Sequence, residues 1–383
     1  MTPERAPINP PERLLCGPGP SNVEPAVLAA MQKPMLGHLD PDMHEILHEV
    51  VHLLRAAYKA PDGLVIPLQA TGTSGMETGL ACLLEPGDTA IVGVCGFFGR
   101  RIVEIARRYG ANVVEVEADW GDHVPNAALL EALEQHPDAR LIAVVHAETS
   151  TGVQHPVREL AEQLRGRDTL LFVDCVTSLG GIELDVGGWG IDYAYSCTQK
   201  CLAAPPGMSP IAVSERALER IAARKEPPVS YSFDLDLLKK YWIDRPVVYH
   251  HTAPILHIYA LHEALRGVVE EGLEARWARH AEVGAYLQRE VTSRGFDLLA
   301  ESDRQLPQLT AVRVPVGVDG KAVQEKLLSE HNIEVGGGLG PAAPAMWRLG
   351  LMGYNATIET ADRLLEGFDA VLANEPALAS SRA

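Results

Sequence analysis

The feature that most constrains this chain is the recurrence of short, almost continuously apolar runs with helical patterns between them. The apolar runs have strand length, and the segments between them place apolar residues at three- and four-residue spacing. Strands buried on both faces and separated by helices predict a doubly wound, mainly parallel α/β sheet. The expected strands cover residues 64–68, 90–94, 112–116, 141–145, 170–173, 193–196 and 211–213.

The last third of the chain has a different pattern. Residues 254–290 show apolar positions at helical spacing and are expected to form one long helix. Strand and helix patterns then alternate up to residue 372, which predicts a small α+β unit. For 383 residues, at roughly 100–200 residues per domain, we expect an N-terminal arm (1–22), a large α/β domain (23–273) and a small α+β domain (274–383).

The charge balance indicates which partners are not expected. The chain has 33 basic and 51 acidic side chains and a formal net charge of −18, whereas nucleic-acid binding needs a basic face. No apolar run reaches the ~18 residues of a membrane-spanning helix. We therefore expect neither a nucleic-acid nor a membrane partner, and we look for function in a small-molecule site.

The cysteines and the two ends of the chain bear on its location. Six cysteines lie mostly in apolar runs without a C-x-x-C pair, which indicates neither a disulfide framework nor a zinc knuckle. The start carries no apolar core of signal-peptide length, and the final SSRA lacks a peroxisomal address. These features predict a cytoplasmic protein.

One short motif suggests a zinc site. Residues 44–48, His-Glu-Ile-Leu-His, match H-E-x-x-H, which on a helix brings two imidazoles to one face. The extended form of the motif fails, because Val51 and Leu54 stand where it needs glycine and histidine. We therefore expect no metal here and interpret the segment as an amphipathic helix that buries apolar side chains. These side chains are Ile46, Leu47, Val50 and Leu53.

Two charged residues follow buried strands of the predicted sheet. Lys200 lies after the strand 193–196 and before a Pro-Pro-Gly turn, at the edge where α/β sheets bind ligands. Desolvation there lowers the pKa of an amine and makes it a usable nucleophile. Asp174 ends the strand 170–173, where a buried carboxylate needs a cationic partner such as a protonated pyridine nitrogen. Taken alone, a solvated lysine and a capping or ion-paired aspartate are the alternatives.

Residues 69–77, QATGTSGME, follow the strand 64–68 and open a helix. Their backbone N–H groups and hydroxyls predict a phosphate cradle at a helix N-terminus. The spacing of Gly72 and Gly75 fits neither a dinucleotide fingerprint nor a P-loop. An ordinary N-cap is the other interpretation.

Several longer stretches together resemble one family. They are LLCGPGPSN (14–22), HAETSTGV (146–153), VDCVTSLGG (173–181), SCTQKCLAAPPG (196–207), YHHTAP (249–254), GGLGP (337–341) and WRLGLMGYNAT (347–357). The set resembles the class V, fold-type I aminotransferases that use pyridoxal 5′-phosphate, and most closely the alanine–glyoxylate and serine–pyruvate aminotransferases. The resemblance covers almost the whole chain, and it implies an obligate homodimer with shared active sites.

The resemblance also implies how the cofactor ring would be held. Lys200 would bind the cofactor as a Schiff base, and Asp174 would orient its pyridine nitrogen. Phe98 falls where the family stacks an aromatic side chain on the ring, often tryptophan. Thr149 should reach the ring hydroxyl.

Further residues are implied for the phosphate and the substrate. In the same subunit, the phosphate would be held by Thr71, Gly72, Thr73 and Gln199. Tyr249 and Thr252 would reach it from the neighbouring subunit. Thr73 stands where some relatives have histidine, so that contact differs from theirs. Arg348 would bind the substrate carboxylate, where a surface ion pair is the alternative, and Gly19 would leave room for the substrate.

The implied reaction is a ping-pong transamination in which Lys200 is both anchor and acid/base. The expected donor is alanine or serine and the expected acceptor glyoxylate or pyruvate. Ureidoglycine–glyoxylate and phosphonate-substrate aminotransferases also fit in part. A cysteine desulfurase is disfavoured, because no cysteine follows Cys201 and Gln199 stands where those enzymes have histidine. A non-catalytic scaffold would be expected to have lost Lys200 or Asp174.

Overall fold

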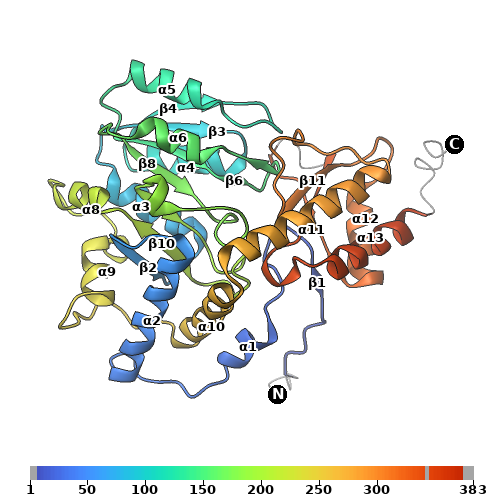
Figure 1. Cartoon of the computed structure of the whole chain (residues 1–383), viewed down its shortest axis with the longest axis horizontal. Helices are drawn as coiled ribbons and strands as arrows, with labels where there is room; N and C mark the ends of the chain where they lie inside the picture. The colour runs from blue at the N-terminus through green and yellow to red at the C-terminus, as the bar shows by residue number, and fades with distance from the viewer. Residues whose placement is uncertain (1–6, 341–344, 374–383) are drawn as a thin grey trace, which may run out of the picture.

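The computed structural model describes residues 7–340 and 345–373. The chain forms a large body built on a twisted sheet and a smaller body beside it, and the helices α10 (Ile255–Glu271) and α11 (Leu273–Ser293) lead from one to the other (Figure 1). The C-terminal SSRA and Pro341 of the GGLGP stretch lie outside the described residues.

The central sheet has seven strands in the order β2-β10-β9-β8-β5-β3-β4. Its strands are β2 (Leu64–Leu68), β3 (Thr89–Val94), β4 (Asn112–Glu117), β5 (Leu141–Val145), β8 (Leu170–Asp174), β9 (Tyr193–Tyr195) and β10 (Ser209–Val213). All pairs are parallel except those of β10, which runs antiparallel to β2 and β9. The predicted mainly parallel α/β fold is therefore confirmed.

One expectation about this sheet is wrong in detail. We expected every strand to be buried on both faces, but β4 is at most half-buried along its length. The reason is its place at the edge of the sheet, where only β3 pairs with it. The central strands β5 and β8 are buried at every residue.

Helices cover the sheet and follow its strands in the chain. α2 packs on β2, α3 packs on β9 and β10, and α4 packs on β3 and β5.

Residue type explains where α2 begins, because the Asp40 side chain accepts a hydrogen bond from the Asp42 N–H and Pro41 occupies the first turn. The helices of this body are α1 (Pro25–Ala30), α2 (Pro41–Tyr58), α3 (Gly72–Leu83), α4 (Phe97–Arg108), α5 (Asn126–Gln135), α6 (Val157–Leu164), α7 (Val186–Trp189), α8 (Glu215–Ala222), η1 (Tyr231–Phe233) and α9 (Leu235–Trp242).

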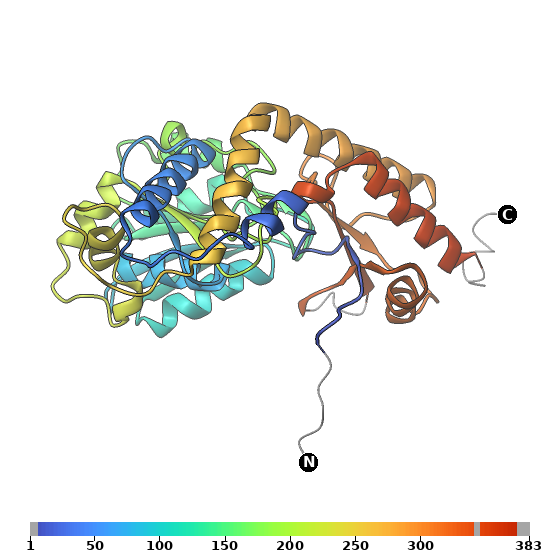
Figure 2. The ribbon, with the colours of Figure 1, turned by 90° about the horizontal axis from the view of Figure 1, so that it is seen from below.

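The smaller body has an antiparallel three-stranded sheet in the order β11-β14-β13, with α11 packing on α13 and α13 on α12. A short N-terminal strand, β1, pairs in parallel with β12 of this body, and the next segment leads to α1 beside α10 (Figure 2). The remaining elements are β1 (Leu14–Leu15), β6 (Ala147–Glu148), β7 (Val153–Gln154), β11 (Leu309–Arg313), α12 (Gly320–His331), β12 (Ile333–Glu334), β13 (Gly336–Gly337), β14 (Met346–Gly350), η3 (Gly353–Asn355) and α13 (Ile358–Leu372).

The expectation of a single long helix over residues 254–290 is wrong. The chain instead forms α10 and α11, which meet at Gly272. Gly272 has φ 82° and ψ 139°, a conformation open to glycine but strained for other residues. The helical spacing continues across this position, so the hydrophobic pattern alone does not reveal the break.

The described residues contain two main hydrophobic cores. One runs from Ala30 to Val268 around the seven-stranded sheet, and the other joins Val283–Leu372 side chains to Cys16 of the N-terminal arm. We propose that these cores correspond to the expected large and small domains, with the arm (1–22) attached to the small domain through β1.

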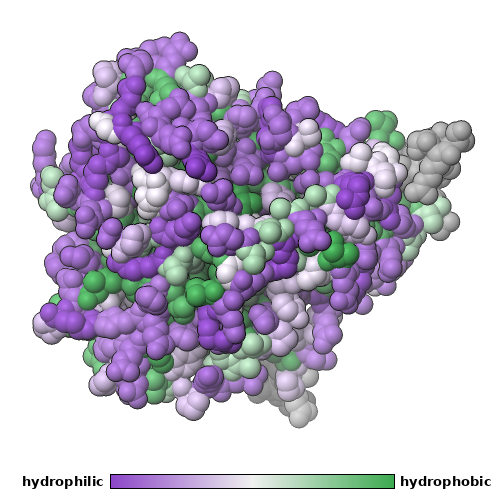
Figure 3. Space-filling model, viewed as in Figure 1, coloured by the Kyte–Doolittle hydropathy of each residue, from purple (hydrophilic) through white to green (hydrophobic). Residues whose placement is uncertain are grey.

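Hydrophilic residues cover most of the face in Figure 3, and hydrophobic ones appear between them in small groups. Within residues 7–340 and 345–373, no helix combines the length and apolarity that crossing a membrane requires. All six cysteines are buried and none forms a disulfide.

Candidate active site

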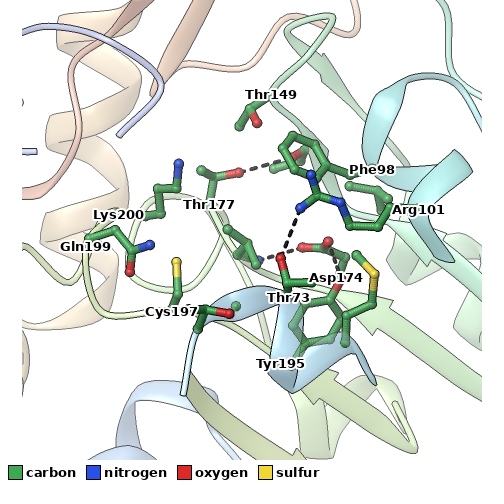
Figure 4. Close-up of a pocket in the computed structure, with 16 residues that line it drawn as sticks. Thr73, Phe98, Arg101, Thr149, Asp174, Thr177, Tyr195, Cys197, Gln199 and Lys200 are labelled. Atoms are coloured by element: carbon green, nitrogen blue, oxygen red, sulfur yellow. Dashed lines mark hydrogen bonds between the residues drawn. The ribbon is translucent and has the colours of Figure 1, made fainter. Parts of the chain in front are cut away.

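A cavity opens at the carboxyl ends of the parallel strands. Val145, Asp174 and Tyr195 end β5, β8 and β9, and strand pairing sets them side by side on its floor. Loops and helix starts complete the wall (Figure 4). The predicted site residues that line it are Thr71, Gly72, Thr73, Phe98, Thr149, Asp174, Gln199 and Lys200.

Asp174 presents a buried carboxylate to this cavity. One of its oxygens accepts a hydrogen bond from the Val176 N–H at 2.8 Å, and the other accepts one from the Tyr195 hydroxyl. No basic side chain forms an ion pair with it in the described part of the chain. Burial raises the pKa of Asp174 to about 7, and the two hydrogen bonds oppose that rise only in part. A cationic group in the cavity would therefore be strongly favoured beside it.

Lys200 lies across the cavity from Asp174 (Figure 4). Its loop is fixed by hydrogen bonds, since the Thr198 hydroxyl donates to the Pro205 carbonyl at 2.6 Å and the Ala204 N–H donates to the Thr198 carbonyl at 2.9 Å. Burial lowers the pKa of the Lys200 amine. A smaller fraction of the amine is then protonated at neutral pH, as a nucleophile or proton acceptor requires.

The N-terminal arm reaches the same lysine. The Lys200 amine donates a hydrogen bond to the Pro18 carbonyl. Gly19 follows with φ +105°, and a Cβ there would lie 2.5 Å from Lys200 Nζ. Gly19 does not line the cavity itself, so the space that its missing side chain leaves is occupied here by the lysine.

The predicted cradle lies at the start of α3. Thr71 is its N-cap, and the Thr71 hydroxyl oxygen accepts a hydrogen bond from the Ser74 N–H at 3.3 Å. A Cβ on Gly72 would approach Cys197 Cβ to 3.2 Å, so glycine allows the helix start to pack closely against the loop after β9. Gln199 Oε1 is buried and has no hydrogen-bond partner among the described residues, which leaves this amide available to a ligand in the cavity.

A buried glutamate positions Phe98. Glu148 Oε2 accepts hydrogen bonds from the N–H groups of Phe98 and Gly99 at 3.0 and 3.3 Å, which caps the N-terminus of α4. Its other oxygen accepts from the Ser150 hydroxyl at 2.6 Å. Glu148 thus fixes the first turn of α4, from which the Phe98 ring reaches the cavity.

Arg348 is buried just behind the cavity wall and is not among the lining residues. Its Nε donates to the Gly337 carbonyl at 2.7 Å, and Nη1 donates to the carbonyl of Thr149, which does line the cavity, at 3.3 Å. Burial lowers the pKa of Arg348 to about 10. The alternative of a surface ion pair is wrong, because the side chain is 7% exposed and has no acidic partner among the described residues.

Two predicted cofactor contacts are not brought to the cavity within this chain. Tyr249 is 57% exposed, and the centre of its ring lies 5.5 Å from the centre of the His38 ring. Thr252 is also exposed. Neither lines the cavity. Their assignment to a neighbouring subunit remains a prediction.

The histidines of the H-E-x-x-H match lie on α2 with a cationic neighbour. Arg245 contacts His48, and burial together with Arg245 lowers the pKa of both His44 and His48. A guanidinium at this position opposes the binding of a metal cation. Within the described ranges, no three His, Cys, Asp or Glu side chains are placed to hold a metal ion.

Sequence reasoning missed several residues of the site. Tyr195, Thr177, Cys197 and Arg101 also line the cavity (Figure 4). Tyr195 could have been found, because it ends the strand next to the one that ends at Asp174. Arg101 could not, since only the packing of α4 beside α3 brings it to Thr73.

The family model for aminotransferase class-V matches residues 14–359. The chain belongs to the class V aminotransferases. It is similar to the (S)-ureidoglycine–glyoxylate transaminase of Bacillus subtilis, with 38% identity over 94% of this chain and 91% of the relative. It is also similar to the alanine–glyoxylate aminotransferase of Rattus norvegicus, with 39% identity over 97% of this chain and 90% of that relative.

Solved structures of class V aminotransferases share the fold. The alanine–glyoxylate aminotransferase from Nostoc sp. superimposes with a TM-score of 0.94 at 46% identity, covering 96% of this chain and 97% of the other. The ureidoglycine–glyoxylate aminotransferase from Bacillus subtilis superimposes with a TM-score of 0.94 at 38% identity, covering 97% of this chain and 96% of the other. The chain thus has the fold of the fold-type I enzymes.

Class V aminotransferases depend on pyridoxal 5′-phosphate, and the residues of this cavity fit that cofactor. Asp174 is a buried carboxylate that forms no ion pair with a basic side chain of the described residues, as a protonated pyridine nitrogen requires. At the start of α3, the N–H groups of Gly72 and Thr73 have no hydrogen-bond acceptor in the described part of the chain and suit a phosphate, and Lys200 supplies an amine. These three features lie around one cavity, which matches the three polar ends of the cofactor.

Proposed function

We propose that this protein transfers an amino group between a small amino acid, alanine or serine, and a small 2-oxo acid, glyoxylate or pyruvate. The observation that carries the proposal is the placement of the Lys200 amine and the Asp174 carboxylate across one cavity. Arg348, next to that cavity, provides a single guanidinium for a substrate carboxylate.

The chemistry divides between the cofactor and the chain. Bound pyridoxal 5′-phosphate supplies an electron-accepting ring that stabilises negative charge at the substrate Cα. Lys200 would anchor the cofactor and, once released, its amine would carry a proton from the substrate Cα to C4′ of the cofactor. Asp174 holds the proton on the pyridine nitrogen, and its own burial strengthens that pairing.

Arg348 orients the substrate for this proton transfer. Its hydrogen bonds to the Gly337 and Thr149 carbonyls fix the guanidinium plane, and Nη2 has no hydrogen-bond partner among residues 7–340 and 345–373. A planar guanidinium binds a carboxylate through paired hydrogen bonds. Because Thr149 and Lys200 line the same cavity and the charge of Arg348 acts on Lys200, a carboxylate held by Arg348 would lie at the cavity that contains the amine.

The cofactor contacts complete the proposal. Thr71, Gly72, Thr73 and Gln199 hold the phosphate, Phe98 stacks on the ring and Thr149 reaches the ring hydroxyl. Gly19 keeps the arm clear of the reacting amine, because any side chain there would meet Lys200.

The acceptor is better supported than the donor. The relatives named for alanine and the relative named for ureidoglycine share glyoxylate in their names. Their identities to this chain are similar, so (S)-ureidoglycine is the second candidate donor. The 46% identity to the Nostoc enzyme favours alanine.

Spectra of the half-reactions test the choice of amino donor and of 2-oxo acid acceptor. The holoenzyme is mixed with alanine, serine or (S)-ureidoglycine, and the change in visible cofactor absorption is followed. We expect alanine or serine to drive it fastest, and glyoxylate or pyruvate to restore the original spectrum. A response to (S)-ureidoglycine alone would contradict the proposed donor while leaving transamination in place.

We further propose a cytoplasmic homodimer with shared active sites. Free, buried cysteines support a reducing location. Exposed apolar side chains on segments that meet around Tyr249 support a partner surface, since His38, next to Leu39, packs against the Tyr249 ring and Tyr231 stacks on His250. Sedimentation tests the assembly, since a monomer at working concentration would contradict shared sites.

A further inference from the structure

Arg101 has an unusual place beside the cavity. It projects from α4 and lines the cavity together with Phe98 (Figure 4). Its Nη1 donates a hydrogen bond to the Thr73 hydroxyl at 3.0 Å. Its guanidinium lies 5.0 Å from the centre of the Phe98 ring and 5.1 Å from that of Phe97. The side chain is therefore held in one position from two directions.

Arg101 forms no ion pair among the described residues, although its charge acts on Asp174 in the same cavity. Among the described residues, no carboxylate lies within ion-pair distance of its guanidinium. The neighbouring Arg100 differs, since it pairs with Glu117 at 3.0 Å. A half-buried arginine that stacks on aromatic rings and has no ion-pair partner in the described part of the chain is suited to an anionic ligand.

The predicted phosphate cradle lacks a cation of its own. Thr71, Gly72, Thr73 and Gln199 are neutral, and only Arg101 and Lys200 among the lining residues are basic. Lys200 is committed to the opposite end of the cofactor. A phosphate at the start of α3 carries close to two negative charges at neutral pH, of which a helix N-terminus balances only a part.

We propose that Arg101 binds the phosphate group of the cofactor and supplies the positive charge that the start of α3 lacks. The Thr73 hydroxyl, 3.0 Å from Nη1, holds the guanidinium at the cradle. The inference rests on the cradle assignment in the proposed function. It makes α4 a carrier of both the ring-stacking and the phosphate-binding side chains.

The test compares ligands with and without a phosphate. The full chain, freed of its cofactor, is titrated with pyridoxal 5′-phosphate and with pyridoxal. The dissociation constant for pyridoxal divided by that for pyridoxal 5′-phosphate measures what the phosphate contributes to affinity. We expect Arg101→Gln to weaken pyridoxal 5′-phosphate by about 10- to 100-fold, as for loss of a charge-assisted hydrogen bond. Pyridoxal affinity should stay unchanged, and Arg101→Lys should fall between.

Two further variants make the result interpretable. Arg100→Gln removes a neighbouring charge on the same helix that pairs with Glu117, and it should leave the ratio unchanged. Thr71→Val removes a cradle hydroxyl and should lower the ratio of the two dissociation constants. Parallel weakening of both ligands by Arg101→Gln would overturn the inference, because Arg101 would then act through the Phe98 ring. An unchanged ratio in Arg101→Gln alone would overturn it too, while unchanged ratios in both Arg101→Gln and Thr71→Val would reject the cradle itself.

Discussion

Asp174 and Tyr195 are register partners on the adjacent parallel strands β8 and β9, and the Tyr195 hydroxyl donates a hydrogen bond to the Asp174 carboxylate. The sheet thereby orients the carboxylate without neutralising it. A hydrogen bond to the ionised form lowers the pKa of Asp174, but burial outweighs it and leaves that pKa at about 7. The carboxylate is thus prepared for a direct cationic partner, which no side chain among the described residues provides.

Replacing Asp174 should impair chemistry more than folding. Asp174→Asn keeps the shape and loses the charge that holds the proton on the pyridine nitrogen. We expect turnover to fall by about a thousandfold, as for loss of strong electrostatic stabilisation in other active sites. Steady-state kinetics on folded holoenzyme measure this.

Asp192→Asn is the matched control for that variant. Asp192 is also buried, but it pairs with Arg216 away from the cavity. Its loss should lower the melting temperature and leave the turnover of folded enzyme near normal. Near-normal turnover in Asp174→Asn would contradict the assigned role.

The stability of the cofactor-free chain should depend on Asp174 between about pH 4 and pH 7. Its folded-state pKa of about 7 lies above the ~4 of an unfolded aspartate, so the folded chain binds this proton more tightly. The stabilisation is fully present below about pH 4 and is lost as the pH rises through 7. Thermal unfolding at a series of pH values should show a decline that is shallower in Asp174→Asn. Parallel curves for the two proteins would contradict the raised pKa.

Glu148 should matter for stability through the start of α4. Glu148→Ala removes the acceptor of the hydrogen bonds from the Phe98 and Gly99 N–H groups and leaves them buried without that partner. We expect the free energy of unfolding to fall by about 1–3 kcal/mol. Glu104→Ala, a change on α4 itself at an exposed residue that pairs with Arg108, should cost under about 1 kcal/mol. Equal losses in the two variants, measured by denaturant unfolding, would argue against the buried cap.

Gly19 should be sensitive to a single methyl group. In Gly19→Ala, the new Cβ would lie 2.5 Å from Lys200 Nζ, in a backbone with φ +105°. Either the arm or the lysine must move, and each ~1.4 kcal/mol of transition-state stabilisation that is lost lowers kcat/KM tenfold. We expect kcat/KM to fall at least tenfold in Gly19→Ala. Gly37→Ala, where nothing lies within 4 Å, should be silent, and equal activity of both variants would show that the arm tolerates the shift.

Much of the large body could be predicted from the sequence because its signals are local. Buried parallel strands such as β5 and β8 appear as continuous apolar runs, and Asp174 is marked by its position at the end of one. Lys200 and the start of α3 follow strands in the same way. The break at Gly272 was missed because helical spacing continues through it and a glycine within a helical pattern is ambiguous.

The rest of the site depends on packing that no local pattern encodes. Arg101 joins Thr73 only because α4 packs beside α3. Glu148, the last residue of β6, reaches the start of α4 although it lies 50 positions from Phe98 in the chain. The burial of Arg348 depends on β14 and on its contact with Thr149, 199 positions away in the chain.

The central claim is that Lys200 holds the cofactor across the cavity from Asp174. The most direct measurement is borohydride reduction of the yellow holoenzyme, followed by proteolysis and mass spectrometry. The account predicts that the reduced cofactor is attached to the peptide containing Lys200 and that Lys200→Ala carries no label. A label on another lysine, or a label that persists in Lys200→Ala, would contradict it.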